Sequence, residues 1–162
     1  MEIKSTLINK AAEELTVIYR DIDSSSGLEG RKVSGVRAYC FLGNKLVIVC
    51  AGAKGAWTPP GGGVEDGESY EQAVVREVLE ETNMKVIKQA VLGYQDITEK
   101  DRIITQTRSV CIVEPYGEFV SDPDEDITEM RLIDPAEYKE YFDWGVVGDH
   151  LMKRALELKS TL

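Results

Sequence analysis

The sequence is poor in the residues that build most metal centres and covalent catalytic sites. It has one histidine, His150, and three cysteines among 162 residues. A single histidine excludes any site made of several histidines. The cysteines, Cys40, Cys50 and Cys111, stand singly in apolar runs. An odd number without paired spacing indicates buried, reduced thiols rather than disulfides or a zinc site.

Long hydrophobic runs are also missing. No apolar segment approaches the roughly 18 residues that a membrane-spanning helix needs. Residues 1–4 are Met-Glu-Ile-Lys, which is not the start of a signal peptide with an apolar core. The sequence therefore predicts a cytoplasmic protein with no membrane partner.

Positive charge is scarce as well, with 19 basic against 29 acidic residues and a net charge of −10. A field of that sign repels a nucleic-acid backbone, so we expect no nucleic-acid polymer as a partner. A small phosphorylated substrate remains compatible with this charge, provided that a metal ion and a few local cations receive it.

The length and the 43% hydrophobic content predict one globular domain with a proper core. Strand-like segments are expected at 33–42 and 45–51, around a Gly43-Asn44 hairpin turn, and at 85–98, 103–113 and 129–133. A long Pro/Gly-containing loop is expected at 52–63. Helices are expected at 136–142, after Pro135, and at the C-terminus, where five residues would face inward: Val147, Leu151, Met152, Ala155 and Leu158.

The N-terminal residues 1–32 read as an extension ahead of the main domain at 33–162. Residues 9–15 contain helix formers, whereas residues 15–19 are rich in β-formers. A strand near 15–22 is favoured.

The most informative stretch is residues 62–84, GGVEDGESYEQAVVREVLEETNM. Its second half has helical character, and a helix turns about 100° per residue. Glu77, Glu80 and Glu81 then share one face within an arc of roughly 100°. The face centred about 150° away is expected to pack against the core, and it carries four residues: Val75, Val78, Leu79 and Thr82.

Three carboxylates on one helical face repel each other by a few tenths of a kcal/mol per pair. One explanation is an ordinary solvated acidic face on an amphipathic helix. The other is a divalent cation, because Mg²⁺ and Mn²⁺ prefer carboxylate oxygens and keep waters for a phosphate or a nucleophile.

The spacing separates these two explanations. Counted from Gly62, five residues precede Glu68, and seven more separate Glu68 from Arg76-Glu77. Val78, one further residue and Glu80-Glu81 follow, and two residues separate Glu81 from Met84. This pattern resembles the Nudix box, the signature of the Nudix hydrolase superfamily. One position departs from it, since Asn83 stands where the family usually has glycine. Asparagine tolerates the left-handed conformation that ends a helix, so we expect the helix to stop there.

The resemblance implies a fold and a chemistry. The fold is α/β, an α/β/α sandwich around a mixed β-sheet, which the order of the expected elements also suggests. The chemistry is hydrolysis of a nucleoside diphosphate linked to another group X, with Mg²⁺ or Mn²⁺ and an activated water. By position, Glu77, Glu80 and Glu81 would be metal ligands, and one of the box glutamates, or a carboxylate from a later loop, would be the general base. Arg76 would orient the carboxylates, and Glu68 would be structural.

Residues outside the helix complete the expected site. Gly62 and Gly63 would let the backbone approach a phosphate, and Trp57 could stack on a base or cap the core. Arg102 and Arg108 could reach a substrate phosphate, although solvent-facing strand charges are commoner. Many Nudix enzymes also bring an acidic residue to the metals from a later loop. In the acidic loop at 118–126 the candidate is Glu125, against the simpler reading of a solvated surface.

The substrate stays open at this point. A nucleoside triphosphate is the default, and an ADP-ribose or nucleotide-sugar pyrophosphatase is the alternative. The N-terminal extension keeps the alternative and a homodimer in view, because such relatives often use extra N-terminal strands in a dimer. A Nudix-fold nucleotide sensor without turnover is a further hypothesis. Sensors of that kind usually lose box carboxylates, and this chain keeps all of them.

Overall fold

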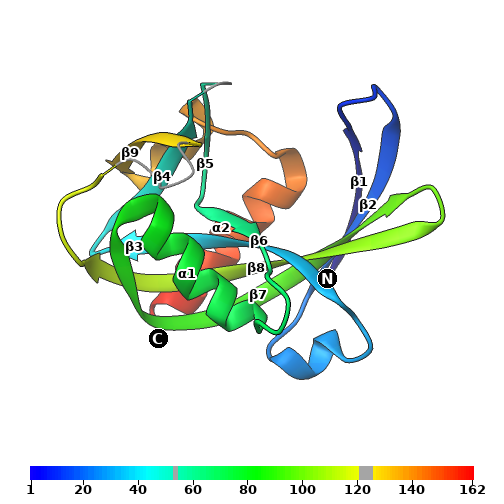
Figure 1. The fold of residues 1–162 in the computed structure, drawn as a ribbon, viewed down its shortest axis with the longest axis horizontal. Helices are drawn as coiled ribbons and strands as arrows, with labels where there is room; N and C mark the ends of the chain where they lie inside the picture. The colour runs from blue at the N-terminus through cyan, green and yellow to red at the C-terminus, as the bar shows by residue number, and fades with distance from the viewer. Residues whose placement is uncertain (53–54, 121–125) are drawn as a thin grey trace.

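A mixed β-sheet forms the centre of the molecule (Figure 1). The computed structural model describes residues 1–52, 55–120 and 126–162. Within them the sheet has nine strands: β1 (Glu2–Ile8), β2 (Glu14–Asp21), β3 (Val33–Leu42), β4 (Lys45–Ala51), β5 (Ala56–Thr58), β6 (Gly61–Gly63), β7 (Met84–Glu99), β8 (Arg102–Pro115) and β9 (Ile127–Ile133). The helices are α1 (Tyr70–Thr82) and α2 (Gly145–Lys159), with short 3₁₀ turns η1 (Ser25–Leu28) and η2 (Pro135–Glu140).

The strands run in the order β1-β2-β7-β8-β3-β4-β5, with β6 paired to β3 and β9 paired to β4. The central pair β3–β8 is parallel, whereas the other pairs are antiparallel. The expected mixed sheet is therefore confirmed.

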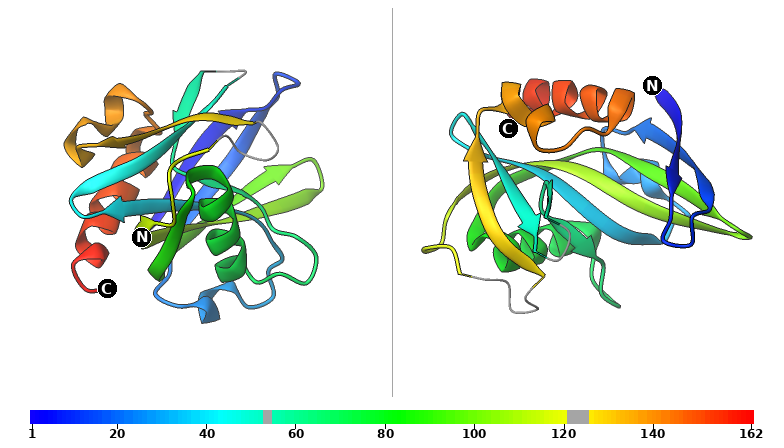
Figure 2. Two further views of the ribbon diagram at one scale, coloured as in Figure 1. Left: turned by 60° about the vertical axis from the view of Figure 1, so that its left-hand side comes forward. Right: turned by 90° about the horizontal axis from the view of Figure 1, so that it is seen from above.

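The two helices cover opposite faces of this sheet, as the right-hand view of Figure 2 shows. Strand β3 explains the division, because successive side chains of a strand point to opposite faces. Val36, Ala38 and Cys40 join the core under α1. Tyr39 and Phe41 join the core under α2. This arrangement confirms the α/β/α sandwich.

The N-terminal residues join the same sheet. The strand expected near 15–22 is confirmed as β2, which pairs with β7. Strand β1 was not expected. The helix formers at 9–15 do not form a helix. Residues 9–13 form a turn, in which the Asn9 side chain accepts the N–H groups of Ala11 and Glu13 at 3.0 and 2.9 Å. Figure 1 shows the β1–β2 and β7–β8 hairpins extending together away from the helices.

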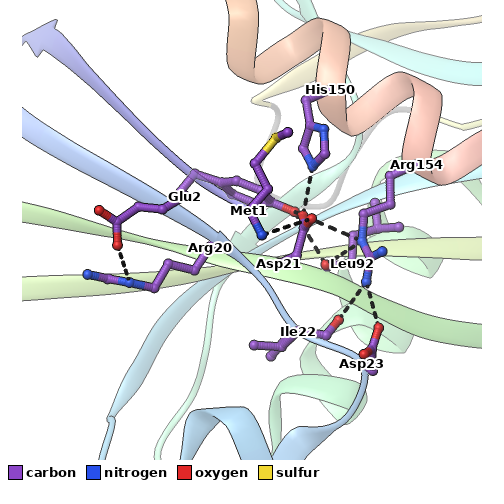
Figure 3. A network of polar contacts seen from close by, with 10 residues as sticks. Met1, Glu2, Arg20, Asp21, Ile22, Asp23, Leu92, His150 and Arg154 are labelled. Carbon is purple, nitrogen blue, oxygen red and sulfur yellow. Dashed lines mark hydrogen bonds and ion pairs between the residues drawn. The ribbon is translucent and has the colours of Figure 1, made fainter.

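A polar network ties this N-terminal hairpin to α2 (Figure 3). Asp21 accepts the Tyr19 hydroxyl at 2.8 Å and lies 2.8 Å from His150 Nε2. Arg154 donates to the Leu92 carbonyl at 2.8 Å. Burial alone would raise the pKa of Asp21, but the hydrogen bonds from His150 and Tyr19 outweigh it and hold the pKa below its usual value. The network links β2 to α2 on the face of the sheet that α2 covers.

Several smaller expectations were tested as well. The helix expected at 136–142 is the short 3₁₀ turn η2 instead, with the Asp134 side chain accepting the Ala136 N–H. The loop expected at 52–63 contains strands β5 and β6. The inward face of the C-terminal helix is confirmed, as are the three buried free cysteines. No helix among the described residues is long and apolar enough to cross a membrane.

Candidate active site

Helix α1 has well-defined ends, which fix the position of its carboxylates. Ser69 and Gln72 form a capping box, with hydrogen bonds of 2.9 and 3.1 Å between each side chain and the other residue's N–H. At the other end Asn83 takes the left-handed conformation, with φ 54°. The expected helix stop is therefore confirmed. The Asn83 side chain also donates to the Glu118 carbonyl at 2.6 Å, a contact that glycine could not make.

The buried face of α1 differs from the expected one. Val78 and Thr82 are buried, but Val75 and Leu79 are each 41% exposed, so their assignment to the packed face was wrong. The helix is rotated so that Ala73 and Val74 are buried, together with Glu81, whose exposure is 7%. The rotation has a polar cause, because a Glu81 carboxylate oxygen (Oε1) accepts the Gly61 N–H at 2.8 Å.

Arg76 is the common partner of the remaining acidic side chains. Its Nε and Nη2 bind the two carboxylate oxygens of Glu68 at 2.8 and 2.9 Å, a bidentate pair. Its Nη1 donates to Glu77 at 2.9 Å and to Glu80 at 3.3 Å. Nη2 also donates to the Gly63 carbonyl at 2.8 Å. One guanidinium thus links the helix start, two metal-ligand candidates and strand β6.

The protonation states follow from these contacts. The hydrogen bonds from Arg76 lower the pKa of Glu68 to about 2. The same bonds raise the pKa of Arg76 above its usual value. Both groups are therefore charged near neutral pH.

Two glycines of strand β6, Gly61 and Gly62, have no room for a side chain. A Cβ at Gly62 would lie 2.4 Å from the carboxyl carbon of Glu77, and one at Gly61 would lie 2.2 Å from the Val36 carbonyl oxygen. The sequence suggested that glycine lets the backbone approach a phosphate. In the structure, Gly62 lets the backbone approach the Glu77 carboxylate.

The carboxylates suit a hard divalent cation, since all their donors are oxygen. Glu77, Glu80 and Glu81 come from the last two turns of α1, and Glu77 and Glu81 border strand β6. They hold protein partners in this arrangement, and no three acidic, histidine or cysteine side chains of the described residues converge on one point. An ion binding here would therefore have to replace part of the contact that Arg76 makes with Glu77 and Glu80.

Two cavities lead away from this cluster. The smaller one, about 140 Å³, is lined by Gly62 and Gly63 and also by Arg37 and Gln106. The larger one, about 610 Å³, shares Arg37 and Gln106 with the first. Its walls come from the β1–β2 hairpin on one side and from the start of α2 on the other. The shared residues make the two cavities adjacent, with the smaller one at strand β6 and the larger one between the β1–β2 hairpin and the start of α2.

Two arginines line the larger cavity, the half-buried Arg37 and the buried Arg108. Arg37 donates to the Thr58 hydroxyl at 3.0 Å and to the Pro59 carbonyl at 2.8 Å. Burial lowers its pKa, and the negative charge of Glu81 opposes that effect. Arg108 is 6% exposed, and burial, with the nearby charge of Arg37, lowers its pKa to about 10. Its Nε has no hydrogen-bond partner among the described residues.

Sequence reasoning selected Arg108 but missed Arg37. The signal was present, because Arg37 is the one charged residue within the apolar run of β3, at a position where a solvent-facing role would not be expected.

Two other expected residues lie apart from the cavities. Arg102 pairs with Glu99 at 3.3 Å at the exposed end of β7–β8. Trp57 packs edge-on against Tyr141, with ring centroids 5.8 Å apart.

The acidic loop contributes little to the described structure. Glu125, the expected additional metal ligand, lies outside the described residues. The next residue, Asp126, is described, and its backbone carbonyl accepts the Gly52 N–H at 3.0 Å.

Comparison with known proteins agrees with this geometry. The family model for the NUDIX domain matches residues 31–154. An ADP-ribose pyrophosphatase from Methanocaldococcus jannaschii is 33% identical over 90 residues, which are 56% of this chain and 47% of that protein. The matched region thus spans about half the length of that curated relative.

Solved structures show the same fold at low sequence identity. The Bacillus subtilis pyrophosphohydrolase BsRppH has a TM-score of 0.70 and 20% identity, with 94% of this chain and 96% of that chain covered. A MutT protein from Bacillus halodurans has a TM-score of 0.57 and 20% identity, with 74% and 78% covered. Because the family model covers most of the chain and the box carboxylates surround Arg76 and strand β6, the chain belongs to the Nudix hydrolase family, whose members use divalent metal ions to hydrolyse phosphoanhydrides in small nucleotide substrates.

Proposed function

We propose that this protein is a metal-dependent pyrophosphohydrolase that cleaves a phosphoanhydride bond in a nucleoside diphosphate linked to X. One observation carries the proposal. The full set of box carboxylates is gathered around Arg76 and strand β6, next to two adjacent cavities lined by Arg37 and the buried Arg108. That combination offers a cation site and an anion site side by side.

In this proposal Glu77, Glu80 and Glu81 hold Mg²⁺ or Mn²⁺. The cation would neutralise charge on the phosphate oxygens and bring a water within reach of phosphorus. Arg76 keeps the carboxylates of Glu77 and Glu80 in position, and one of these two is the general base. Phosphoryl transfer depends mainly on such positioned charge, which is why no protein nucleophile is required.

The protein's own cations act on the substrate side. Arg37 lies close enough to Glu81 and Glu77 for their negative charges to oppose the lowering of its pKa by burial. A phosphate between Arg37 and the carboxylate-bound cation would be neutralised from two directions.

The preferred substrate in this proposal is a nucleoside triphosphate. A second candidate, ADP-ribose or a nucleotide sugar, is favoured by the likeness to the M. jannaschii ADP-ribose pyrophosphatase. A nucleotide sensor without turnover would be compatible with the fold, but the complete carboxylate set speaks against it.

Incubation of the purified protein with Mg²⁺ and a substrate panel tests the proposal. The panel contains canonical and oxidised nucleoside triphosphates, ADP-ribose, sugar nucleotides and dinucleotides, and products are identified by mass. Nucleoside monophosphate plus pyrophosphate would support the triphosphate proposal, whereas AMP plus ribose phosphate would support the second candidate. Binding without metal-dependent cleavage of any member would favour the sensor.

A further inference from the structure

We propose that Arg108, oriented by Gln106, selects substrates that carry an anionic group beyond the diphosphate that is cleaved. The enzyme would then prefer nucleoside triphosphates to nucleoside diphosphates linked to a neutral sugar. This inference rests on the proposed pyrophosphohydrolase function and identifies its substrate class.

The first step is the missing counter-charge of Arg108. Its guanidinium is buried, yet no ion pair joins it to a carboxylate within the described part of the chain. Among the described residues its donors reach the Thr107 carbonyl at 3.0 Å and the Gln106 side chain at 3.2 Å, and Nε has no hydrogen-bond partner. The guanidinium carbon also lies 5.8 Å from the ring centroid of Trp144, a contact that brings no negative charge. The acidic side chain that lines the same cavity, Asp143, accepts the Gly145 N–H at 2.9 Å. A buried guanidinium without a carboxylate partner would be stabilised by an anion from outside the chain.

The second step is the orientation of Gln106. An arginine can only donate, so the amide oxygen of Gln106 must face Arg108. Gln95, its cross-strand neighbour, donates to the same oxygen at 3.3 Å. Two donors on one oxygen fix the amide group and therefore the guanidinium beside it. Glutamate could make the same contacts, but it would neutralise Arg108. Glutamine holds the guanidinium in place and leaves its charge available.

The third step is the position of Arg108 relative to the two cavities. Arg37 and Gln106 line both cavities, whereas Arg108 lines only the larger one. Arg37 is affected by the charges of Glu81 and Glu77, and Arg108 is affected by Arg37 and by two tyrosines. The order is thus carboxylates, Arg37, Arg108. A diphosphate between the carboxylates and Arg37 leaves Arg108 for a further anionic group, and a neutral ribose or hexose there would leave its charge uncompensated.

The test compares kcat and KM for a nucleoside triphosphate and for ADP-ribose in the wild type and in Gln106→Glu, with Mg²⁺. We expect the wild type to favour the triphosphate. In Gln106→Glu the added carboxylate pairs with Arg108, so KM for the triphosphate should rise about tenfold or more. KM for ADP-ribose should stay within about twofold, because its sugar needs no cation.

Two further variants complete the design. Asn44→Asp adds the same charge at an exposed hairpin turn and should change neither KM. Arg108→Gln removes the cation and should weaken triphosphate binding in the same direction as Gln106→Glu. Gln106→Glu should melt at or above the wild-type temperature, since it supplies a missing counter-charge. A general packing defect would lower the melting temperature and affect both substrates.

The outcomes separate the two proposals. A rise in KM confined to the triphosphate supports the role of Arg108. An equal rise for both substrates would place the cleaved diphosphate itself on Arg108 and overturn the inference, as would a wild-type preference for ADP-ribose. In both of those cases the pyrophosphohydrolase function stands. If the wild type cleaves no member of the panel in a metal-dependent way, the proposed function itself fails.

Discussion

The replacement Glu81→Gln tests the proposed metal site with little disturbance of the fold. Glutamine has nearly the same shape and keeps an oxygen that can accept the Gly61 N–H, now 2.8 Å from Glu81. It removes the negative charge from a side chain that is 7% exposed and close to Arg37. The change therefore acts on charge and leaves the packing of α1 in place.

The expected magnitudes differ widely for stability and activity. Replacing a charged acceptor by a neutral one weakens a hydrogen bond by about 1 kcal/mol, and relief of repulsion from Glu77 returns a few tenths. A net change near 1 kcal/mol moves the melting temperature by about 2–4 °C for a chain of this size. Loss of one metal ligand should cost about 3–5 kcal/mol in the transition state, which lowers kcat about 10² to 10⁴-fold.

Two assays are needed, with Glu71→Gln as the matched control. Glu71 lies in the first turn of the same helix and is exposed. Its replacement by glutamine should leave both assays near the wild type. Turnover measures the catalytic loss, and the rise in melting temperature with added Mg²⁺ measures ion binding, because an ion that binds only the folded state stabilises it. Near-normal kcat and an unchanged Mg²⁺ effect in Glu81→Gln would refute the assignment of Glu81 as a ligand.

Two further predictions concern the neighbours of this site. Gly62→Ala should lower kcat by at least about tenfold, because a Cβ there would collide with the Glu77 carboxyl group at 2.4 Å. Gly63→Ala, whose Cβ would meet its nearest neighbour at 3.9 Å, should behave almost as the wild type in the same assay. Arg76→Gln should remove the main cause of the lowered Glu68 pKa, which is about 2 in the fold and 4.5 for an unperturbed glutamate. A lowered carboxyl pKa stabilises the fold above pH 4.5, and this stability is lost as the pH falls toward 2, so urea unfolding of the variant should depend less on pH in that window. An unchanged pH dependence would refute the pairing.

Much of the fold could be predicted because it is encoded locally. The 62–84 stretch carries its own capping box, its glycines and its left-handed stop at Asn83, so helix and loop follow from neighbouring residues. The same holds for the β3–β4 hairpin around Gly43-Asn44. Strand β1 was missed because its residues are mostly exposed and polar, and its pairing with β2 is what makes it a strand.

The site could be predicted only in part, for a different physical reason. Periodicity identified the carboxylate face of α1 but placed Val75 and Leu79 in the core, because it could not include the bond from Gly61 that turns Glu81 inward. The two arginines meet only through the pairing of β3 with β8, in which Arg37 lies opposite Arg108. Contacts between residues so distant in sequence leave no local pattern.

That parallel pairing also sets the order in which a newly made chain can become active. Residues 33–41 of β3 pair with residues 105–112 of β8, so the centre of the sheet waits for about 70 further residues to be synthesised. The carboxylates of α1 leave the ribosome before Gln106 and Arg108 do. A chain that ends before β8 would carry the proposed metal ligands without the arginine cavity, and β3 would expose an unpaired edge that favours aggregation. Truncation therefore threatens solubility before it can leave a partly active enzyme.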